Sequence, residues 1–240
     1  MTYCLGIKLK EGIVGIADTR ITSGTETTMG KKLFTHQEGS NSLFLMTSGL
    51  RSVRDKALTY FKEVLADKSE PLDKIFKVAN VFSEQIRRVA KEDKAYLEEA
   101  KLSFNIHTLI GGQMEGDTEH HLYLIYPQGN WIEIGASAPF MIIGNSGYGK
   151  PILSRSITKE VGIPFALKTG LLSFDSTRVC ANDVGYPIDV FIYEKDSFNI
   201  KQMRFEEKDL RQYTEQWASI LKDGIHEMSA EWVNLVGEKK

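Results

Sequence analysis

Hydrophobic positions in the first fifty residues alternate with polar or small ones in short runs, the two-residue period of β-strands. Residues 2–9 and 13–18 form the first two runs, and the Lys-Glu-Gly between them is typical of a tight hairpin turn. Residues 32–36 and 41–49 form a second pair of runs around another turn. The chain is therefore predicted to begin with two antiparallel strand pairs.

After residue 50 the apolar residues follow the three- and four-residue intervals of amphipathic helices. Two long helices are predicted. Their apolar positions are Val53, Ala57, Tyr60, Phe61, Val64 and Leu65, then Leu72, Ile75, Phe76, Ala79, Phe82, Ile86 and Val89. The second helix is expected to run as far as Ala100. Four aromatic residues are expected in the core: Tyr60, Phe61, Phe76 and Phe82.

Strands and helices then alternate in groups. The predicted strands are 104–112, 121–127, 131–135 and 140–144, followed by helices at 150–156 and 163–174, a hairpin at 187–205 and a C-terminal helix at about 207–235. No linker or repeat divides this order. It predicts an α+β fold in a single domain, 1–240, with two stacked antiparallel sheets covered by helices on both outer faces.

The composition narrows the possible partners. Of 240 residues, 30 are basic and 32 acidic, with a net charge of −2, which argues against nucleic acid or an anionic membrane as the main partner. Two cysteines, Cys4 and Cys180, fit a reducing compartment. Without a signal-peptide pattern or a stretch able to span a bilayer, the expected location is the cytoplasm. The histidine spacing suggests no metal site.

Thr2 is the first candidate for chemistry. Initiator methionine is normally trimmed before a small residue, and removal of Met1 would leave a threonine with both a hydroxyl and a free α-amine. A hydroxyl becomes a useful nucleophile when a nearby base takes its proton, and an N-terminal threonine carries such a base. Because many chains start with Met and a small residue, other features have to support this interpretation.

Charged residues are predicted to surround the start of the chain. Thr2 begins one strand and Asp18 and Arg20 end the next, so hairpin pairing brings them close. Lys32 opens the following strand and is preferred over Lys31, because it directly precedes the apolar run and only one of the two can face inward. An ammonium held by Asp18 would lower the pKa of the threonine hydroxyl. Alternatively, Asp18 caps a turn and Arg20 pairs with it.

These segments resemble a known family. A starting threonine, the run GIVGIADTR and a later lysine before an apolar strand are similar to proteasome β-type subunits. More narrowly, MTYCLGIKL, IGNSGYGKPIL, LLSFDSTR and VGYPIDV resemble the bacterial ancestral β-subunit family, Anbu, of predicted proteasome-type proteases. The resemblance runs from residue 2 to about residue 195. It implies the four-layer αββα sandwich of the N-terminal-nucleophile (Ntn) hydrolases.

The resemblance implies catalytic roles for five positions. Thr2 matches the nucleophile, Asp18 and Lys32 the charge pair beside it, and Arg20 a supporting ion-pair residue. Gly49 matches the glycine whose backbone N–H faces the developing oxyanion. An alternative for Gly49 is a purely structural role at a tight junction between strand and helix.

Further positions are implied around this centre. Ser146 falls in or near the serine beside the amine, and Asp183 is expected to take over part of the role of a serine that the segment VCANDVG lacks. Ile21, Thr47 and Arg51 would line the substrate pocket. Arg51 suggests acidic or polar substrate side chains.

The predicted activity is that of a threonine-type peptidase that cleaves peptide bonds through an ester on Thr2, without a cofactor or metal. Its substrates would be peptides or unfolded proteins, and its partner further copies of itself in a homo-oligomer, which for the Anbu family implies an open, helically rising ring. Two alternatives stay open. One is an Ntn amidohydrolase for a special amide or isopeptide, and the other is a catalytically weak scaffold subunit.

Overall fold

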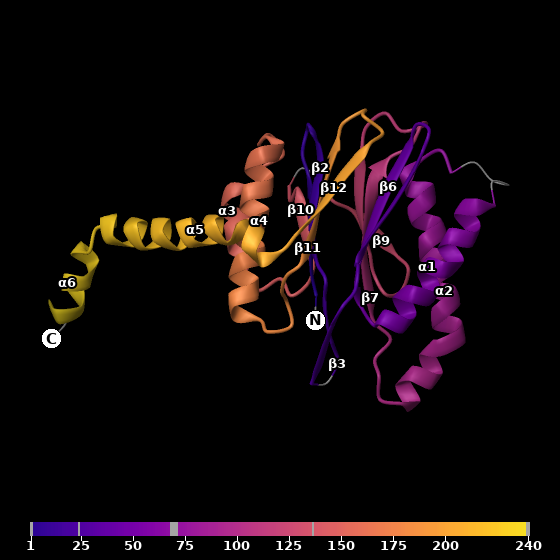
Figure 1. Cartoon of the computed structure of the whole chain (residues 1–240), viewed down its shortest axis with the longest axis horizontal. Coiled ribbons are helices and arrows are strands. Elements are labelled where there is room, and N and C mark those ends of the chain that lie inside the picture. The colour runs from indigo at the N-terminus through magenta and orange to yellow at the C-terminus, as the bar shows by residue number, and fades with distance from the viewer. Residues whose placement is uncertain (1, 24, 68–71, 136, 239–240) are drawn as a thin grey trace. The chain divides into compact units, whose positions relative to one another are not determined.

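The structure, a computed structural model, describes residues 2–23, 25–67, 72–135 and 137–238 (Figure 1). The expected removal of Met1 concerns a residue outside this part of the chain. Antiparallel sheets and helices follow each other nearly in the predicted order, which confirms the α+β class. The chain divides into two compact units, Met1–Phe205 and Glu206–Lys240.

The first sheet contains the start of the chain. Its strand order is β10-β1-β2-β11-β12, and every neighbouring pair is antiparallel. The strands are β1 (Tyr3–Lys8), β2 (Gly12–Asp18), β10 (Phe140–Gly144), β11 (Ile188–Glu194) and β12 (Ile200–Phe205). Because β1 is paired along both edges, the residue that precedes it is held between two neighbouring strands.

The second sheet is also antiparallel, in the order β5-β6-β7-β8-β9. Its strands are β5 (Leu33–Glu38), β6 (Asn41–Gly49), β7 (Ile106–Gln113), β8 (His121–Ile125) and β9 (Trp131–Glu133). Across the space between the two sheets, β1 contacts β6 and β8, and β10 contacts β6 and β7. These contacts bring the start of the chain close to the end of β6.

The structure also contains a third, two-stranded sheet that the sequence did not predict. It consists of β3 (Arg20–Ser23) and β4 (Glu26–Met29), which pair in register from Arg20 with Met29 to Ser23 with Glu26. All four residues of β4 are exposed. A short exposed strand lacks the alternation of apolar and polar residues by which a strand is recognised in a sequence.

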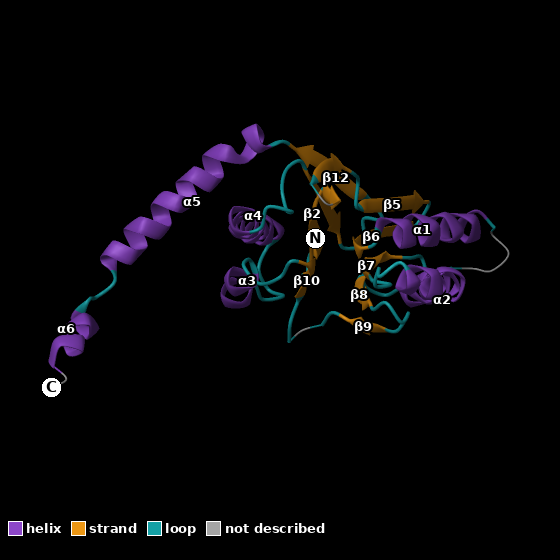
Figure 2. Ribbon diagram, turned by 90° about the horizontal axis from the view of Figure 1, so that it is seen from below, coloured by secondary structure: helices purple, strands orange, loops and turns teal. Residues whose placement is uncertain are grey.

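Helices cover the two large sheets on different sides (Figure 2). α1 (Arg51–Ala66) and α2 (Ile75–Glu99) pack on the second sheet, and α4 (Ile163–Cys180) packs on β1 and β2 of the first. α3 (Lys150–Ser156) lies against α4. α4 continues beyond residue 174, where it was predicted to end. In this added part, the hydroxyls of Ser176 and Thr177 donate to backbone carbonyls one turn earlier, which satisfies these polar groups within the helix.

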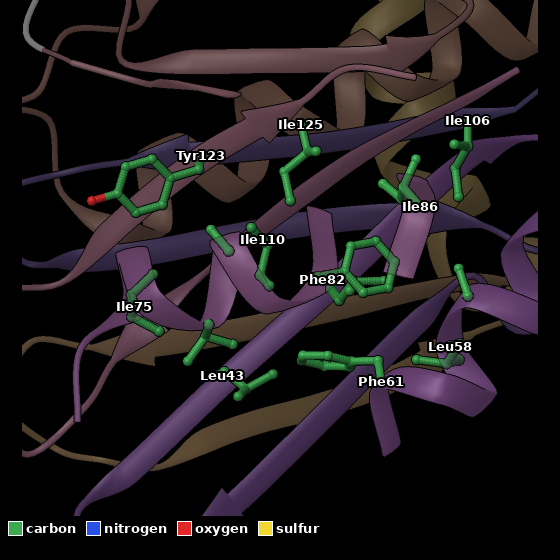
Figure 3. Close-up of a cluster of buried hydrophobic side chains, with 14 of the residues drawn as sticks. Leu43, Leu58, Phe61, Ile75, Phe82, Ile86, Ile106, Ile110, Tyr123 and Ile125 are labelled. Atoms are coloured by element: carbon green, nitrogen blue, oxygen red, sulfur yellow. The ribbon is translucent and has the colours of Figure 1, made fainter. Parts of the chain in front are cut away.

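The core beneath α1 and α2 explains their apolar spacing (Figure 3). Phe61 and Phe82 meet edge to face with ring centroids 5.2 Å apart, and both are completely buried. One prediction was wrong: Phe76 is 38% exposed. It lies one position beyond Ile75, which takes the buried face of α2, and neighbouring helix positions point about 100° apart.

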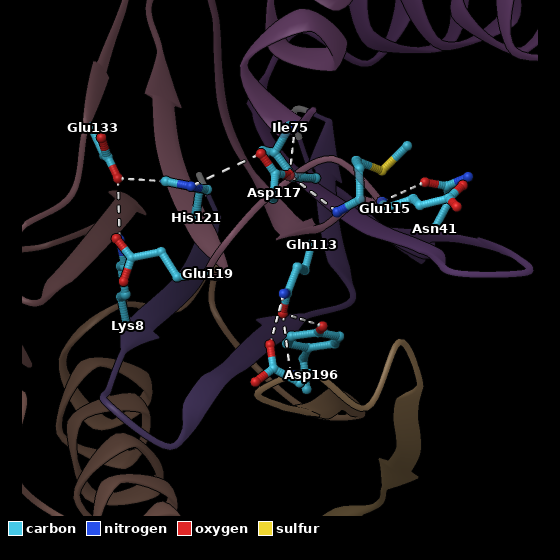
Figure 4. A network of polar contacts seen from close by, with 12 residues as sticks. Lys8, Asn41, Ile75, Gln113, Glu115, Asp117, Glu119, His121, Glu133 and Asp196 are labelled. Carbon is cyan, nitrogen blue, oxygen red and sulfur yellow. Dashed lines mark hydrogen bonds and ion pairs between the residues drawn. The ribbon is translucent and has the colours of Figure 1, made fainter. Parts of the chain in front are cut away.

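Polar side chains tie the sheets and helices together away from Thr2 (Figure 4). Asp117 accepts hydrogen bonds from the backbone N–H groups of Ile75 and Met114, so a distant carboxylate caps the start of α2. Lys8 of the first sheet donates to Glu133 of the second, 3.1 Å away. These contacts fix how the two layers meet.

The C-terminal unit contains α5 (Glu207–Glu227) and α6 (Glu231–Glu238). The sequence predicted one helix here. The helix is interrupted because Met228 adopts an extended backbone and the Ser229 hydroxyl accepts the N–H of Glu231, a cap that starts a new helix. Within the described residues, the helices are too short or too polar to cross a membrane.

Candidate active site

Thr2 lies immediately before β1 and is 7% exposed. Its carbonyl accepts the backbone N–H of Asn145, 2.7 Å away, and the N–H of the next residue, Tyr3, donates to Asp18 Oδ1 at 2.8 Å. The pairing of β1 with β2 sets Cys4 opposite Ala17, so Asp18 falls beside the start of the chain, as the hairpin pattern predicted.

Tyr3 anchors this segment from the other side. Its hydroxyl donates to Ser173 on α4 at 2.7 Å, and its ring meets Phe174 edge to face. Burial raises the pKa of Tyr3, so the phenol keeps its proton and remains a hydrogen-bond donor. Nothing in the sequence motifs pointed to Ser173, because it approaches Tyr3 only through the packing of α4 on the first sheet.

Asp18 and Lys32 form a buried ion pair. Lys32 Nζ lies 2.6 Å from Asp18 Oδ1 and 2.7 Å from the carbonyl oxygen of Arg20. The Asp18 side chain is 0% exposed and the Lys32 side chain is 6% exposed. Burial raises the pKa of Asp18 above its ordinary value, while the Lys32 ammonium and the backbone N–H groups of Tyr3 and Gly185 oppose that rise. A cation is thereby held next to Thr2.

Lys31 takes a different direction. It is exposed, and its ammonium donates to Gln202 Oε1 at 3.3 Å. Of the two neighbouring lysines, it is therefore Lys32 that contacts Asp18. The side chains of adjacent residues in an extended chain point to opposite faces, which separates the two ammonium groups.

Thr2 opens onto a cavity of about 180 Å³. Its lining includes seven residues that the sequence analysis singled out: Thr2, Arg20, Ile21, Lys32, Thr47, Gly49 and Arg51. The remaining lining residues are Thr22, Ser48, Arg54 and Asn105. They come from β3, the end of β6, the start of α1 and the residue before β7, so the cavity exists only once both large sheets and α1 have packed.

Three predicted residues lie outside this lining. Asp18 is behind Lys32, completely buried. Ser146 follows Asn145, which bonds to Thr2, but it lines a separate cavity together with Phe140 and other residues. Asp183 is half-buried in the connection from α4 to β11, next to Asn182, whose carbonyl accepts a hydrogen bond from Arg20 at 2.7 Å.

Two glycines permit the close approach of chain segments around Thr2. Gly49 has φ +129°, and a Cβ there would lie 2.1 Å from the carbonyl oxygen of Asn105. Gly144 has φ +90°, and a Cβ there would lie 1.9 Å from the carbonyl oxygen of Thr2. Gly49 therefore has a structural reason to be glycine, whatever its part in chemistry, and Gly144 lets β10 run directly beside Thr2.

Arg54, Ser48 and Asn105 were missed by sequence reasoning. Arg54 lies one helical turn after Leu50, and its guanidinium donates to the carbonyl of Lys31. The sequence did contain a signal for Arg54. It follows the predicted pocket residue Arg51 by three positions on α1, and residues three or four apart share a helix face. Asn105 belongs to the chain segment that pairs with β6, and no local pattern connects it with Thr2.

Two antiparallel sheets, a threonine at the start of an inner strand and a buried Asp–Lys pair beside it define a protein of the proteasome β-subunit type. Solved structures agree with this class. The chain is similar in fold and sequence to Anbu proteins, the ancestral β-subunits, and this similarity supports its assignment to that family.

Similarity to these structures extends over nearly the whole chain. A Gly-1 mutant of Anbu from Hyphomicrobium sp. strain MC1 is 29% identical over 95% of this chain and 98% of its own, with a TM-score of 0.88. Anbu from Yersinia bercovieri is 27% identical over 95% of this chain and 98% of its own, with a TM-score of 0.88. The chain in a structure of the helical assembly of the Anbu complex from Pseudomonas aeruginosa is 28% identical over 95% of this chain and 97% of its own, with a TM-score of 0.89. No family model and no curated protein matches the chain.

The contact between Gly144 and Thr2 leads to a stability prediction. Gly144→Ala should lower the free energy of unfolding by about 2 kcal/mol, because the new methyl group meets a backbone oxygen at an unfavourable φ. For a domain of this size, that corresponds to a fall in melting temperature of roughly 4–8 °C. Gly147→Ala is the matched control, since a Cβ there meets nothing within 4 Å. Equal melting temperatures of the two variants would contradict the close packing of β10 against Thr2.

Proposed function

We propose that this protein is an N-terminal threonine amidohydrolase that cleaves peptide bonds inside a self-assembled, proteasome-like particle. One observation carries the proposal: the buried Asp18–Lys32 pair lies beside Thr2 at the wall of an open cavity. An ammonium that is fixed and shielded from water acts more strongly on a neighbouring hydroxyl than an exposed one does. We also propose that the two sheets and the helices on their outer faces form the four-layer αββα sandwich of Ntn hydrolases.

The proposed mechanism begins with removal of Met1, which frees the α-amine of Thr2. Thr2 Oγ attacks the carbonyl carbon of the peptide and its proton passes to the α-amine, with Lys32 favouring the developing alkoxide. The carbonyl electrons move to oxygen, and the backbone N–H of Gly49 is the proposed donor to this oxyanion. Collapse breaks the C–N bond, and the departing amine takes the proton.

The second half of the reaction restores the enzyme. The first product remains bound to Thr2 as an ester, and the α-amine takes a proton from the water that attacks it. A second oxyanion forms and collapses, which releases the carboxylic acid and returns the proton to Thr2 Oγ. Ser146 and Asp183 are the proposed polar groups near the amine. All the groups named belong to this chain, so the mechanism uses no cofactor.

The cytoplasm is the proposed location. Cys4 and Cys180 are both free thiols, and Cys180 is exposed. An exposed free thiol persists in a reducing compartment.

Thr2→Ala is the direct test of the nucleophile. We expect hydrolysis of fluorogenic peptides and of an unfolded protein to be abolished, while the melting temperature changes by no more than about 2 °C, because only one small side chain is removed. Intact mass shows whether the wild-type chain starts at Thr2. Thr28→Ala, on the exposed strand β4, is the control and should keep full activity.

The outcome of this test separates the candidate functions. Full activity of the purified Thr2→Ala protein would remove the mechanism. Turnover of a small amide with none on unfolded protein would favour the special-amide alternative. A wild-type protein that assembles with Met1 removed and hydrolyses neither substrate would be a scaffold.

Lys32→Ala should reduce kcat by roughly 100-fold or more, while Lys31→Ala changes it less than about twofold, because only Lys32 contacts Asp18 beside Thr2. Lys32→Ala also leaves the Asp18 carboxylate buried without its partner, at a cost of about 3–5 kcal/mol. The double variant Asp18→Asn with Lys32→Met separates the two effects: it should recover stability and remain inactive. A stable, active double variant would rule out a catalytic ion pair.

Assembly is proposed to involve the C-terminal unit. No residue of α5 is buried, yet Tyr213, Ile220, Leu221 and Ile225 share one face of it, and Trp232 of α6 is 66% exposed. Apolar helix faces of this kind usually lie against another surface. Together with the helical assembly recorded for the Pseudomonas aeruginosa relative, this favours a homo-oligomer, and we propose an open helical ring.

Light scattering during size-exclusion chromatography tests the assembly. The wild-type chain should elute as a particle of many 27.1 kDa subunits. Ile220→Asp should reduce its mass, because a carboxylate in an apolar contact is costly. Gln212→Asp introduces the same group on another face of α5 and should leave the particle intact. A wild-type monomer at micromolar concentration would disprove assembly without affecting the hydrolase proposal.

A further inference from the structure

The cavity at Thr2 has an unbalanced charge. Four cationic side chains line it, namely Arg20, Lys32, Arg51 and Arg54. Among the described residues that line it, none carries a carboxylate. A concave surface lined by one sign of charge attracts ligands of the other sign, and its low-dielectric walls strengthen the effect.

Two of the four cationic side chains have partners outside the cavity lining. Lys32 is paired with Asp18, and Arg20 donates to the carbonyl of Asn182. Arg51 and Arg54 share one carboxylate, that of Asp55: Arg51 Nε lies 3.3 Å from Asp55 Oδ2 and Arg54 Nη1 lies 3.3 Å from Asp55 Oδ1. The Asp55 side chain is half exposed and outside the cavity lining. One solvated carboxylate thus faces two guanidinium groups.

The start of α1 increases this positive potential. α1 begins at Arg51, and its first turn contains no acidic residue. A helix N-terminus carries partial positive charge and normally attracts Asp or Glu, so two arginines in the first turn oppose the usual preference. Local violations of such rules are expected where a site needs them. The arginines and the helix end act together at one wall of the cavity.

The two arginines differ in exposure and in hydrogen bonding. Arg54 is 18% exposed and is held by its hydrogen bond to the carbonyl of Lys31, whereas Arg51 is 61% exposed. Arg54 therefore offers a fixed and weakly screened charge, and Arg51 can adjust to a ligand. A volume of about 180 Å³ suits one side chain, since pockets for whole ligands start at roughly 300 Å³.

We propose that this cavity is a specificity pocket for a carboxylate side chain, so that the protein cleaves after aspartate or glutamate. Arg51 and Arg54 bind the carboxylate, and Ile21 and Thr47 contact its aliphatic part. This assignment rests on the proposed hydrolysis by Thr2, because the cavity receives the residue before the cut bond only if Thr2 is the nucleophile. The carboxylate group could also come from a substrate's C-terminus, and the experiment separates these sources.

Hydrolysis measures the preference first. Three capped fluorogenic peptides that differ only in Glu, Gln or Lys before the leaving group are compared by kcat/KM. We expect Glu to exceed Gln by about tenfold, a difference of about 1.4 kcal/mol, and to exceed Lys by more. Arg51→Gln and Arg54→Gln should each bring the Glu-to-Gln ratio close to one. Arg88→Gln is the matched control, since Arg88 is 54% exposed on α2 and pairs with Glu92 one turn later, as Arg51 pairs with Asp55.

Binding gives a second readout that does not depend on catalysis. The Thr2→Ala protein is titrated with a fluorescent peptide that has Glu as its last residue and an amidated end, with the Gln analogue, and with the Gln analogue bearing a free C-terminal carboxylate. Tighter binding of the Glu peptide by about tenfold, lost in Arg51→Gln, supports the pocket even if the wild type hydrolyses nothing. In that case the hydrolase proposal fails alone. Equal binding of all three peptides, or a preference that follows the free C-terminus, overturns the carboxylate side-chain assignment.

Discussion

The ion pair between Asp18 and Lys32 is the interaction on which the site depends. It joins the end of β2, in the first sheet, to the residue that precedes β5 of the second sheet. The Asp18 carboxylate also accepts a hydrogen bond from the N–H of Tyr3. Removing two charges from water is costly, and the cost is offset only when each charge finds well-placed partners. Here the Arg20 carbonyl and the Tyr3 N–H provide them. The pair therefore forms in one arrangement of the two sheets, and that arrangement sets the position of Thr2.

The two arginines that make the surroundings of Thr2 positive also make the first turn of α1 less stable. Leu50 precedes α1 without a side-chain cap, and Arg51 and Arg54 occupy a turn that normally favours acidic residues. The helix persists because its other face is buried: Val53, Ala57 and Phe61 pack into the core beneath it. Packing of the apolar face supplies most of a helix's stability in a protein, so its exposed first turn is free to serve the cavity.

Much of the fold was predictable from local pattern. The hairpin of β1 and β2, the spacing of α1 and α2, and the preference for Lys32 over Lys31 all follow from side-chain periodicity. The hairpin of β3 and β4 was not predictable, because its second strand is exposed throughout. Arg54 and Asn105 reach the cavity through tertiary packing, and the resemblance to proteasome subunits supplied roles but no contacts. Ser146 shows the limit of a motif: it is next to a residue that touches Thr2, yet it lines another cavity.

The position of Thr2 at the start of an inner strand also limits what can be fused ahead of it. Thr2 is at the start of an inner strand, with β10 on one side and β2 on the other, and it forms part of the cavity wall. A domain fused ahead of Thr2 would keep its nitrogen in a peptide bond, as Met1 does, and would emerge beside the cavity. The proposed reaction needs a free amine at Thr2, so a reporter protein or purification handle placed ahead of Thr2 would have to be removed before that reaction could occur.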